Sequence, residues 1–101
     1  MQNQAADDSS DFRIFETEAF QKNLGKLPAH ELRFVQRKLA EYVYPRLRVD
    51  PSLGPNIKKL RGYRPDTWRY RIGRFRVFFI VDQESRIVSV LSIDDRRDAY
   101  R

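Results

Sequence analysis

The sequence contains no cysteine and a single histidine, His30, and these two shortages exclude several kinds of site. Without cysteine there can be neither a disulfide nor a thiolate metal site, so we expect a protein of the reducing cytoplasm. One histidine excludes multi-histidine metal centres, and neither a Ser/His/Asp set nor a glycine-rich phosphate loop is recognisable. We therefore expect no metal and no cofactor.

Long hydrophobic runs are also missing. No stretch approaches the roughly 20 apolar residues of a membrane span, and no charged-then-apolar leader suggests export, so we expect no membrane partner. The 101 residues are enough for one modest core and too few for two. Residues 1–10, MQNQAADDSS, lack large apolar side chains. We expect them to form a disordered tail before a single domain at residues 11–101.

Positive charge is present in excess. Lysine and arginine number 20 against 14 acidic residues, which gives a net charge of +6 and an isoelectric point near 10. Residues 57–76 contain eight basic residues and one acid. A solvated basic surface would explain this pattern, but such a concentration also favours contact with nucleic acid or another acidic surface.

The segment WRYRIGRFRVFFIV, residues 68–81, alternates arginines with aromatic and β-branched residues. This period of two predicts half-buried strands, and a two-residue turn at Gly73 would fold them into a hairpin. One face is then apolar and expected to be core. It consists of Trp68, Tyr70, Ile72, Phe75, Val77 and Phe79.

The opposite face of this hairpin carries arginines. In the predicted register Arg71 lies directly across from Arg76, and Arg69 lies beside them. Like charges at opposed positions destabilise a strand pair. The hairpin therefore predicts an anionic partner for this face, and a polyphosphate is the natural candidate.

The other elements follow from spacing and from turn residues. We expect a short strand at 12–15, a helix capped by Thr17, a second helix from Pro28 that ends before Pro45, a short strand at 57–60 and a last strand at 86–93. The last strand would run antiparallel to the one before it, so its end would return to the turn at Gly73. The tail would then bring Arg96 and Tyr100 beside the hairpin arginines.

Such a cluster could bind a phosphodiester and promote its cleavage. Arginine binds phosphate with two parallel hydrogen bonds and stabilises the extra charge of a pentacovalent transition state. RNA can be cleaved without a metal by attack of its own 2′-OH. Cations lower the pKa of a nearby tyrosine, so Tyr100 is a candidate general base, although it could equally stack on a base. Asp94 and Asp95 could act as the base instead, or could pair with neighbouring arginines.

Four segments together resemble one family. These are FQKNLGKL in the first helix, IKKLRG before the hairpin, WRYRIGRFRVFFIVD through it, and the ending VLSIDDRRDAY. Over residues 12–101 the chain resembles the RelE/ParE superfamily of bacterial and archaeal toxins, and RelE more than ParE. The resemblance implies an α+β fold, with an N-terminal strand and a helical hairpin packed on a twisted, mainly antiparallel sheet of about four strands. It also implies the toxin of a type II toxin–antitoxin system, a ribosome-dependent endoribonuclease that cuts mRNA in the A site and is neutralised by a cognate antitoxin.

The resemblance assigns roles to individual positions. The catalytic set would be Arg69, Arg71, Arg76, Arg96 and Tyr100. Four further residues, Lys58, Lys59, Arg61 and Arg74, would hold RNA backbone without doing chemistry. Relatives often have a small residue and a histidine or lysine before the tail arginine, where this chain has Asp94 and Asp95. That departure leaves open an RNA-binding module without catalysis. A ParE-like inhibitor of DNA gyrase is the other alternative, and the tail pair of Arg96 and Tyr100 argues against it, because ParE-like chains generally lack these two residues together.

Overall fold

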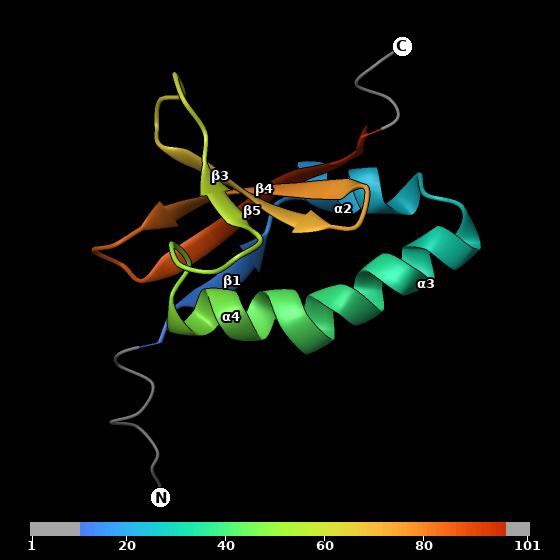
Figure 1. The fold of residues 1–101 in the computed structure, drawn as a ribbon, viewed down its shortest axis with the longest axis horizontal. Helices are drawn as coiled ribbons and strands as arrows, with labels where there is room; N and C mark the ends of the chain where they lie inside the picture. Colours follow the sequence, from blue (N-terminus) through green and yellow to red (C-terminus); the bar gives the residue numbers. More distant parts are fainter. Residues whose placement is uncertain (1–10, 97–101) are drawn as a thin grey trace, which may run out of the picture.

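The computed structural model describes residues 11–96, so the tail expected at residues 1–10 and the tyrosine at position 100 lie outside the described residues. Five strands and a nearly continuous helical run make up the fold (Figure 1). In chain order they are β1 (Arg13–Glu16), α2 (Glu18–Gly25), α3 (Ala29–Lys38), the π-helix η1 (Leu39–Val43), α4 (Tyr44–Val49), β2 (Ile57–Lys59), β3 (Thr67–Ile72), β4 (Phe75–Asp82) and β5 (Ile87–Asp95). Among the described residues no helix is both long enough and apolar enough to cross a membrane.

The sheet has the strand order β1-β5-β4-β3-β2. β1 runs parallel to β5, and every other neighbouring pair is antiparallel. The expected mainly antiparallel α+β fold is therefore confirmed. The sheet has five strands rather than about four, because the N-terminal strand joins it as a parallel edge.

The predicted hairpin register is confirmed pair by pair. Trp68 lies opposite Phe79, Arg71 opposite Arg76, and Ile72 opposite Phe75. Gly73 has a φ of +58°, the left-handed conformation that a two-residue turn requires. The hairpin therefore buries its apolar face and leaves the arginines on the open face of the sheet.

One core holds the helices against the sheet. From the helices it takes Phe20, Leu24, Val35, Leu39, Val43 and Leu47, and from the strands Tyr70, Ile72, Phe75, Val77, Phe79, Val88, Val90 and Ile93. The Thr17 hydroxyl caps α2 as predicted, since it accepts a hydrogen bond from the Phe20 N–H at 3.2 Å. The same hydroxyl donates to the Val90 carbonyl at 2.8 Å, which fixes the start of α2 to β5.

The prediction that the second helix ends before Pro45 is wrong. The helix widens into the π-turn η1, where the Tyr44 N–H bonds to the carbonyl of Leu39 five residues back, and then continues as α4. Pro45 stands in the first turn of α4, where its missing N–H costs little. Continuation buries Leu47 completely and lets the Tyr44 hydroxyl donate to the Glu16 carboxylate at 2.5 Å. Burial, followed by this contact, raises the pKa of Tyr44.

The predicted end of the last strand is also wrong, because β5 continues through Asp95. A register shift opposite Phe78 and Phe79 leaves Leu91 as an extra residue in β5, which is a β-bulge. The bulge reverses the alternation beyond it. Ile93 consequently faces the core, and Asp94 lies on the open face directly opposite Arg76.

Candidate nucleic-acid interface

The open face of the sheet carries four basic residues on three adjacent strands. Lys58 of β2 lies opposite Arg69 of β3, and Arg71 of β3 lies opposite Arg76 of β4. Directly opposed residues of antiparallel strands project from the same face, so the sheet brings these four side chains to one side. We call Lys58, Arg69, Arg71 and Arg76 the arginine face.

The guanidinium groups of this face repel one another. The pKa of Arg69 lies below its ordinary value, first because of partial burial and then because of the positive charges of Arg71 and Arg76. The Arg69 guanidinium also donates to the carbonyl of Asn56 at 3.2 Å. The repulsion expected from the sequence is therefore present, and an anion bound here would relieve it.

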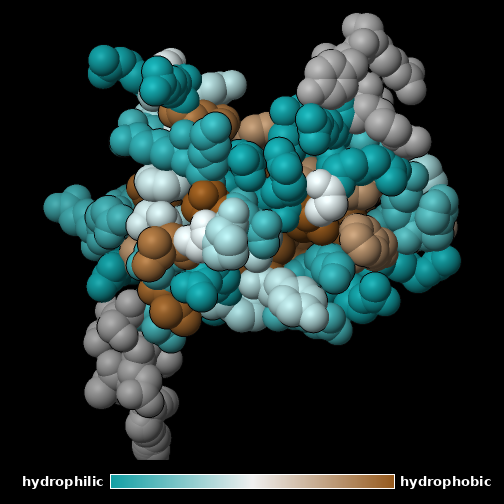
Figure 2. Space-filling model, viewed as in Figure 1, coloured by the Kyte–Doolittle hydropathy of each residue, from teal (hydrophilic) through white to brown (hydrophobic). Residues whose placement is uncertain are grey.

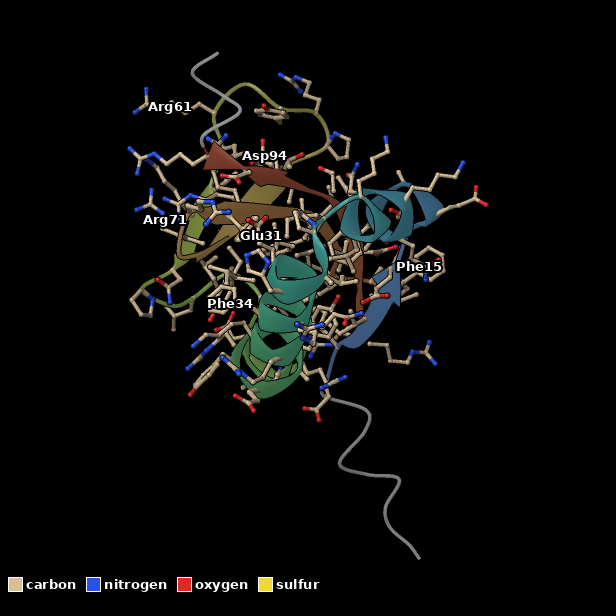
Figure 3. All side chains as sticks on the ribbon, turned by 90° about the vertical axis from the view of Figure 1, so that its right-hand side faces the viewer. Phe15, Glu31, Phe34, Arg61, Arg71 and Asp94 are labelled. Carbon is tan, nitrogen blue, oxygen red and sulfur yellow. The ribbon has the colours of Figure 1, made fainter. Side chains whose placement is uncertain are left out.

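One carboxylate, that of Asp94, pairs with an arginine of this face. The Arg76 guanidinium donates through Nε to Oδ1 of Asp94 at 3.0 Å and through Nη2 to Oδ2 at 3.2 Å. This forked geometry is the one that arginine uses for phosphate. Asp94 thus occupies the binding edge of one arginine. Figure 3 shows Arg71 at the left edge of the view and Asp94 near its top.

Arg74 does not join the arginine face. Its Nε donates to Asp95 at 2.9 Å and its Nη2 to Glu31 at 2.6 Å. The hydrogen bond to Asp95 contributes most to raising the pKa of Arg74. Arg74 therefore ties the hairpin turn to the end of β5 and to the first turn of α3.

The remaining predicted contacts are spread over other surfaces. Lys59 lies opposite Trp68, on the other face from Lys58, and its Nζ pairs with Asp66 at 3.2 Å. Arg61 is exposed in the loop between β2 and β3 (Figure 3). Neither residue is brought to the arginine face by the strand pairing.

The chain does return to the hairpin turn after β5. The Arg96 N–H donates to the Arg74 carbonyl at 2.7 Å, so the residue predicted to complete the cluster lies next to the turn. Its predicted companion Tyr100 lies outside the described residues. Among residues 11–96 there is no group of three or more His, Asp or Glu side chains that could hold a metal ion.

The comparisons with known proteins identify the family. Residues 14–100 match the family model described as the ParE toxin of the type II toxin–antitoxin system parDE. The chain belongs to this toxin family. The comparison with curated proteins finds no match.

Solved structures of RelE toxins share the fold of this RelE/ParE toxin. The RelBE2 toxin–antitoxin complex of Mycobacterium tuberculosis matches with 25% identity and a TM-score of 0.65, over 85% of this chain and 99% of that one. The archaeal RelE–RelB complex of Pyrococcus horikoshii matches with 25% identity and a TM-score of 0.53, over 84% and 94%. The intact RelBE complex of E. coli matches with 24% identity and a TM-score of 0.59, over 83% and 95%, which supports the fold alone.

Sequence reasoning missed a groove beside the arginine face of this toxin. A cavity of about 450 Å³ lies between α3, η1 and β3, and its lining includes Phe34, Lys38, Tyr42 and Arg71. The Lys38 ammonium lies 5.7 Å from the centre of the Phe34 ring and 4.8 Å from that of Tyr42. The regular spacing of residues 34, 38 and 42 was the available signal, because residues four apart share a helix face.

The face of the molecule drawn in Figure 2 shows hydrophobic residues as separate areas among hydrophilic ones. The large apolar side chains that are exposed come from different elements and loops. They are Phe15, Tyr42, Val49, Leu53 and Tyr63. Isolated exposed side chains of this kind are ordinary on a folded protein, so the charge of the arginine face is the stronger indication of a partner.

Proposed function

We propose that this toxin is a metal-independent endoribonuclease that cuts mRNA on the ribosome and so inhibits translation. The proposal is supported chiefly by the convergence of Arg69, Arg71 and Arg76 on one open face, in a register where they repel one another. A phosphodiester would relieve this repulsion, and the arginines would stabilise the charge that develops on its oxygens.

The proposed reaction uses the RNA's own 2′-OH as the nucleophile. The 2′-OH of a ribose attacks the adjacent phosphorus and loses its proton to a base, while the bond to the 5′ oxygen of the next nucleotide breaks and that oxygen takes up a proton. The products are a 2′,3′-cyclic phosphate and a free 5′-OH. Arg71 and Arg76 would hold the two non-bridging oxygens, and Arg96 and Tyr100 remain the proposed groups for charge stabilisation and proton transfer.

The two aspartates are the feature of this site that the resemblance does not explain. Asp94 is bound to Arg76, and Asp95 to Arg74. An RNA phosphate that binds Arg76 in a forked geometry must displace Asp94 or share the guanidinium with it. Asp94 therefore either weakens RNA binding or, once displaced, supplies the general base.

The test is primer extension on mRNA from cells that express the wild type or the Arg96→Ala variant. Cuts at codons in the ribosomal A site that disappear in the variant are expected. Arg37 is an exposed arginine of α3 that takes no part in the site, so Arg37→Ala is the matched control and should cut like the wild type. Intact mRNA in cells that the wild type has stopped from growing would overturn the proposal.

A second function is favoured by one observation, the match to a family model that carries the ParE name. ParE-like chains inhibit DNA gyrase by binding it, and a binding activity would tolerate the pairing of Asp94 with Arg76. Supercoiling assays with purified gyrase separate the two functions. Blocked supercoiling with intact mRNA would favour gyrase, and neither effect would leave an RNA-binding module.

An antitoxin partner is part of the same proposal. The complexes from M. tuberculosis and P. horikoshii each contain a toxin bound to its RelB-type antitoxin. We infer that a cognate antitoxin binds this chain and offsets part of its +6 charge with an acidic or amphipathic segment.

A further inference from the structure

A second group of arginines lies at the opposite end of the sheet from the hairpin turn. Arg13 begins β1, Arg48 is in the last turn of α4, and Arg86 precedes β5. All three line one cavity of about 690 Å³. They come from segments far apart in the chain, which Figure 1 shows meeting where β1 starts beside the end of α4 and the β4–β5 turn.

Backbone hydrogen bonds hold these three segments together. The Phe12 N–H donates to the Arg48 carbonyl at 2.8 Å, and the Arg13 N–H donates to the Arg86 carbonyl at 2.9 Å. The Arg86 guanidinium lies 4.7 Å from the centre of the buried Phe12 ring. This cation–π contact restrains the guanidinium before any ligand arrives. The fold thus places the backbones of all three arginines, and it restrains the side chain of Arg86 as well.

The backbone of Arg86 adds a sign of constraint. Its φ of +60° places a non-glycine residue in the left-handed region, the one such case among the described residues. For a residue other than glycine, asparagine or aspartate this conformation is unfavourable in free energy. Such strained residues are found more often at functional sites. The turn therefore presents Arg86 to the cavity at a small cost in stability.

The charge of this cavity is not balanced from within. Asp11 is the acidic residue of its lining, against three arginines. No ion pair within residues 11–96 joins Arg13, Arg48 or Arg86 to a carboxylate. Arg74, by contrast, is bound to two carboxylates. A cavity with a net positive lining and fork-shaped donors is suited to a phosphate group.

We propose that Arg13, Arg48 and Arg86 form a second phosphate-binding site, which holds a distant part of the same RNA that docks on the arginine face. The inference rests on the proposed function. Arg13 lies opposite Ile87 and Arg76 opposite Asp94, so the two sites are separated by seven residues of β5, or about 23 Å. One RNA chain can reach both sites, and the second contact then becomes intramolecular and raises the overall affinity.

The test compares a single-stranded RNA of about 20 nucleotides, which spans both sites, with a trinucleotide, which does not. In the R13Q/R48Q variant the longer RNA should bind at least about tenfold more weakly, and the slope of log K against log salt should become shallower by about 1.4. The trinucleotide should lose at most about half of its binding, because the arginine face still holds it. R13K/R48K, which keeps the charge, should recover most of the affinity for the longer RNA.

The matched control is R33Q/R37Q, which removes the same charge from exposed positions of α3. It should bind both RNAs nearly as the wild type does. Equal weakening by R13Q/R48Q and R33Q/R37Q would overturn the second site, because net charge alone would then explain the loss. Unchanged binding of the longer RNA by R13Q/R48Q would also overturn it. This holds even if the same variant binds an acidic protein partner more weakly, because the three arginines would then bind protein and not RNA. A wild type that binds neither RNA would overturn the second site as well. Failure of the proposed function appears separately, as uncut mRNA in the primer-extension test.

Discussion

Arg71 and Arg74 lie three residues apart in the same hairpin, but their side chains have different surroundings. Arg71 is exposed on the arginine face, whereas Arg74 pairs with Asp95 and Glu31 on the helical side of the sheet. We predict that Arg74→Gln lowers the midpoint of thermal unfolding and leaves RNA affinity nearly unchanged, because its charge serves the fold. Arg71→Gln should weaken RNA binding, because it removes a side chain that we propose binds phosphate. It should also raise the midpoint of thermal unfolding slightly, because it relieves the repulsion with Arg69 and Arg76.

Two measurements on each variant decide this assignment. Thermal unfolding followed by circular dichroism gives the stability, and fluorescence anisotropy with a short RNA gives the affinity. An Arg74→Gln variant that unfolds like the wild type but binds RNA poorly would place Arg74 in the interface, which is the role that the family resemblance implies for it.

Asp94 occupies the Arg76 guanidinium and so limits the part of the arginine face that could bind a phosphate. Its side chain is 44% exposed, so the pairing with Arg76 is screened by solvent and contributes little to stability. We predict that Asp94→Asn binds RNA more tightly by about 1 kcal/mol, roughly fivefold, because the negative charge beside the phosphate is gone. Anisotropy at low salt measures the change.

The control for this variant is Asp66→Asn, which removes a carboxylate that is paired with Lys59 away from the arginine face. It should change RNA affinity much less. Weaker binding by Asp94→Asn would show that the carboxylate orients Arg76 for RNA instead of competing with it. If tighter binding came with lost cleavage, Asp94 would be the general base.

At the scale of elements, the hairpin was predictable and the two irregular segments were not. The period of two and the glycine turn determine the pairing of Trp68 with Phe79 and of Arg71 with Arg76, because both signals are local. The π-turn before Pro45 and the bulge at Leu91 depend on packing between distant segments, so they cannot be predicted from a local sequence pattern. The bulge matters most for the site, because it brings Asp94 to Arg76.

Replacing the glycine of α2 and the glycine of the hairpin turn by alanine should change the stability of the fold in opposite directions. Gly25 ends α2, and a Cβ added there meets no atom within 4 Å. Gly25→Ala should stabilise the fold by about 0.5–1 kcal/mol by restricting the unfolded chain. Gly73→Ala should destabilise it by about 1–2 kcal/mol, because alanine is strained at a φ of +58°.

Urea denaturation of both glycine variants measures these changes. The difference between them should appear in the midpoint with little change in slope. If Gly25→Ala proved destabilising, the end of α2 would need the conformational freedom that glycine provides.

At the scale of the whole molecule, two clusters of basic residues lie at the two ends of β5. The arginine face lies at the hairpin end, and Arg13, Arg48 and Arg86 lie at the other. The first cluster could be predicted, since its residues alternate along one hairpin. The second could not, because its residues are brought together only when β1, α4 and the β4–β5 turn pack against one another.

This segregation predicts how strongly salt weakens RNA binding. Each phosphate neutralised on a single strand contributes about 0.7 to the slope of log K against log salt, so R69Q/R71Q should make the slope shallower by about 1.4. The R33Q/R37Q control carries the same net charge and should keep the wild-type slope, because those arginines are exposed residues of α3 and are not part of the arginine face. Slopes that fall equally in both variants would mean that RNA responds to the total charge of +6 rather than to where the sheet places it. Affinity that hardly changes with salt in the wild type would remove phosphate contact as the basis of recognition.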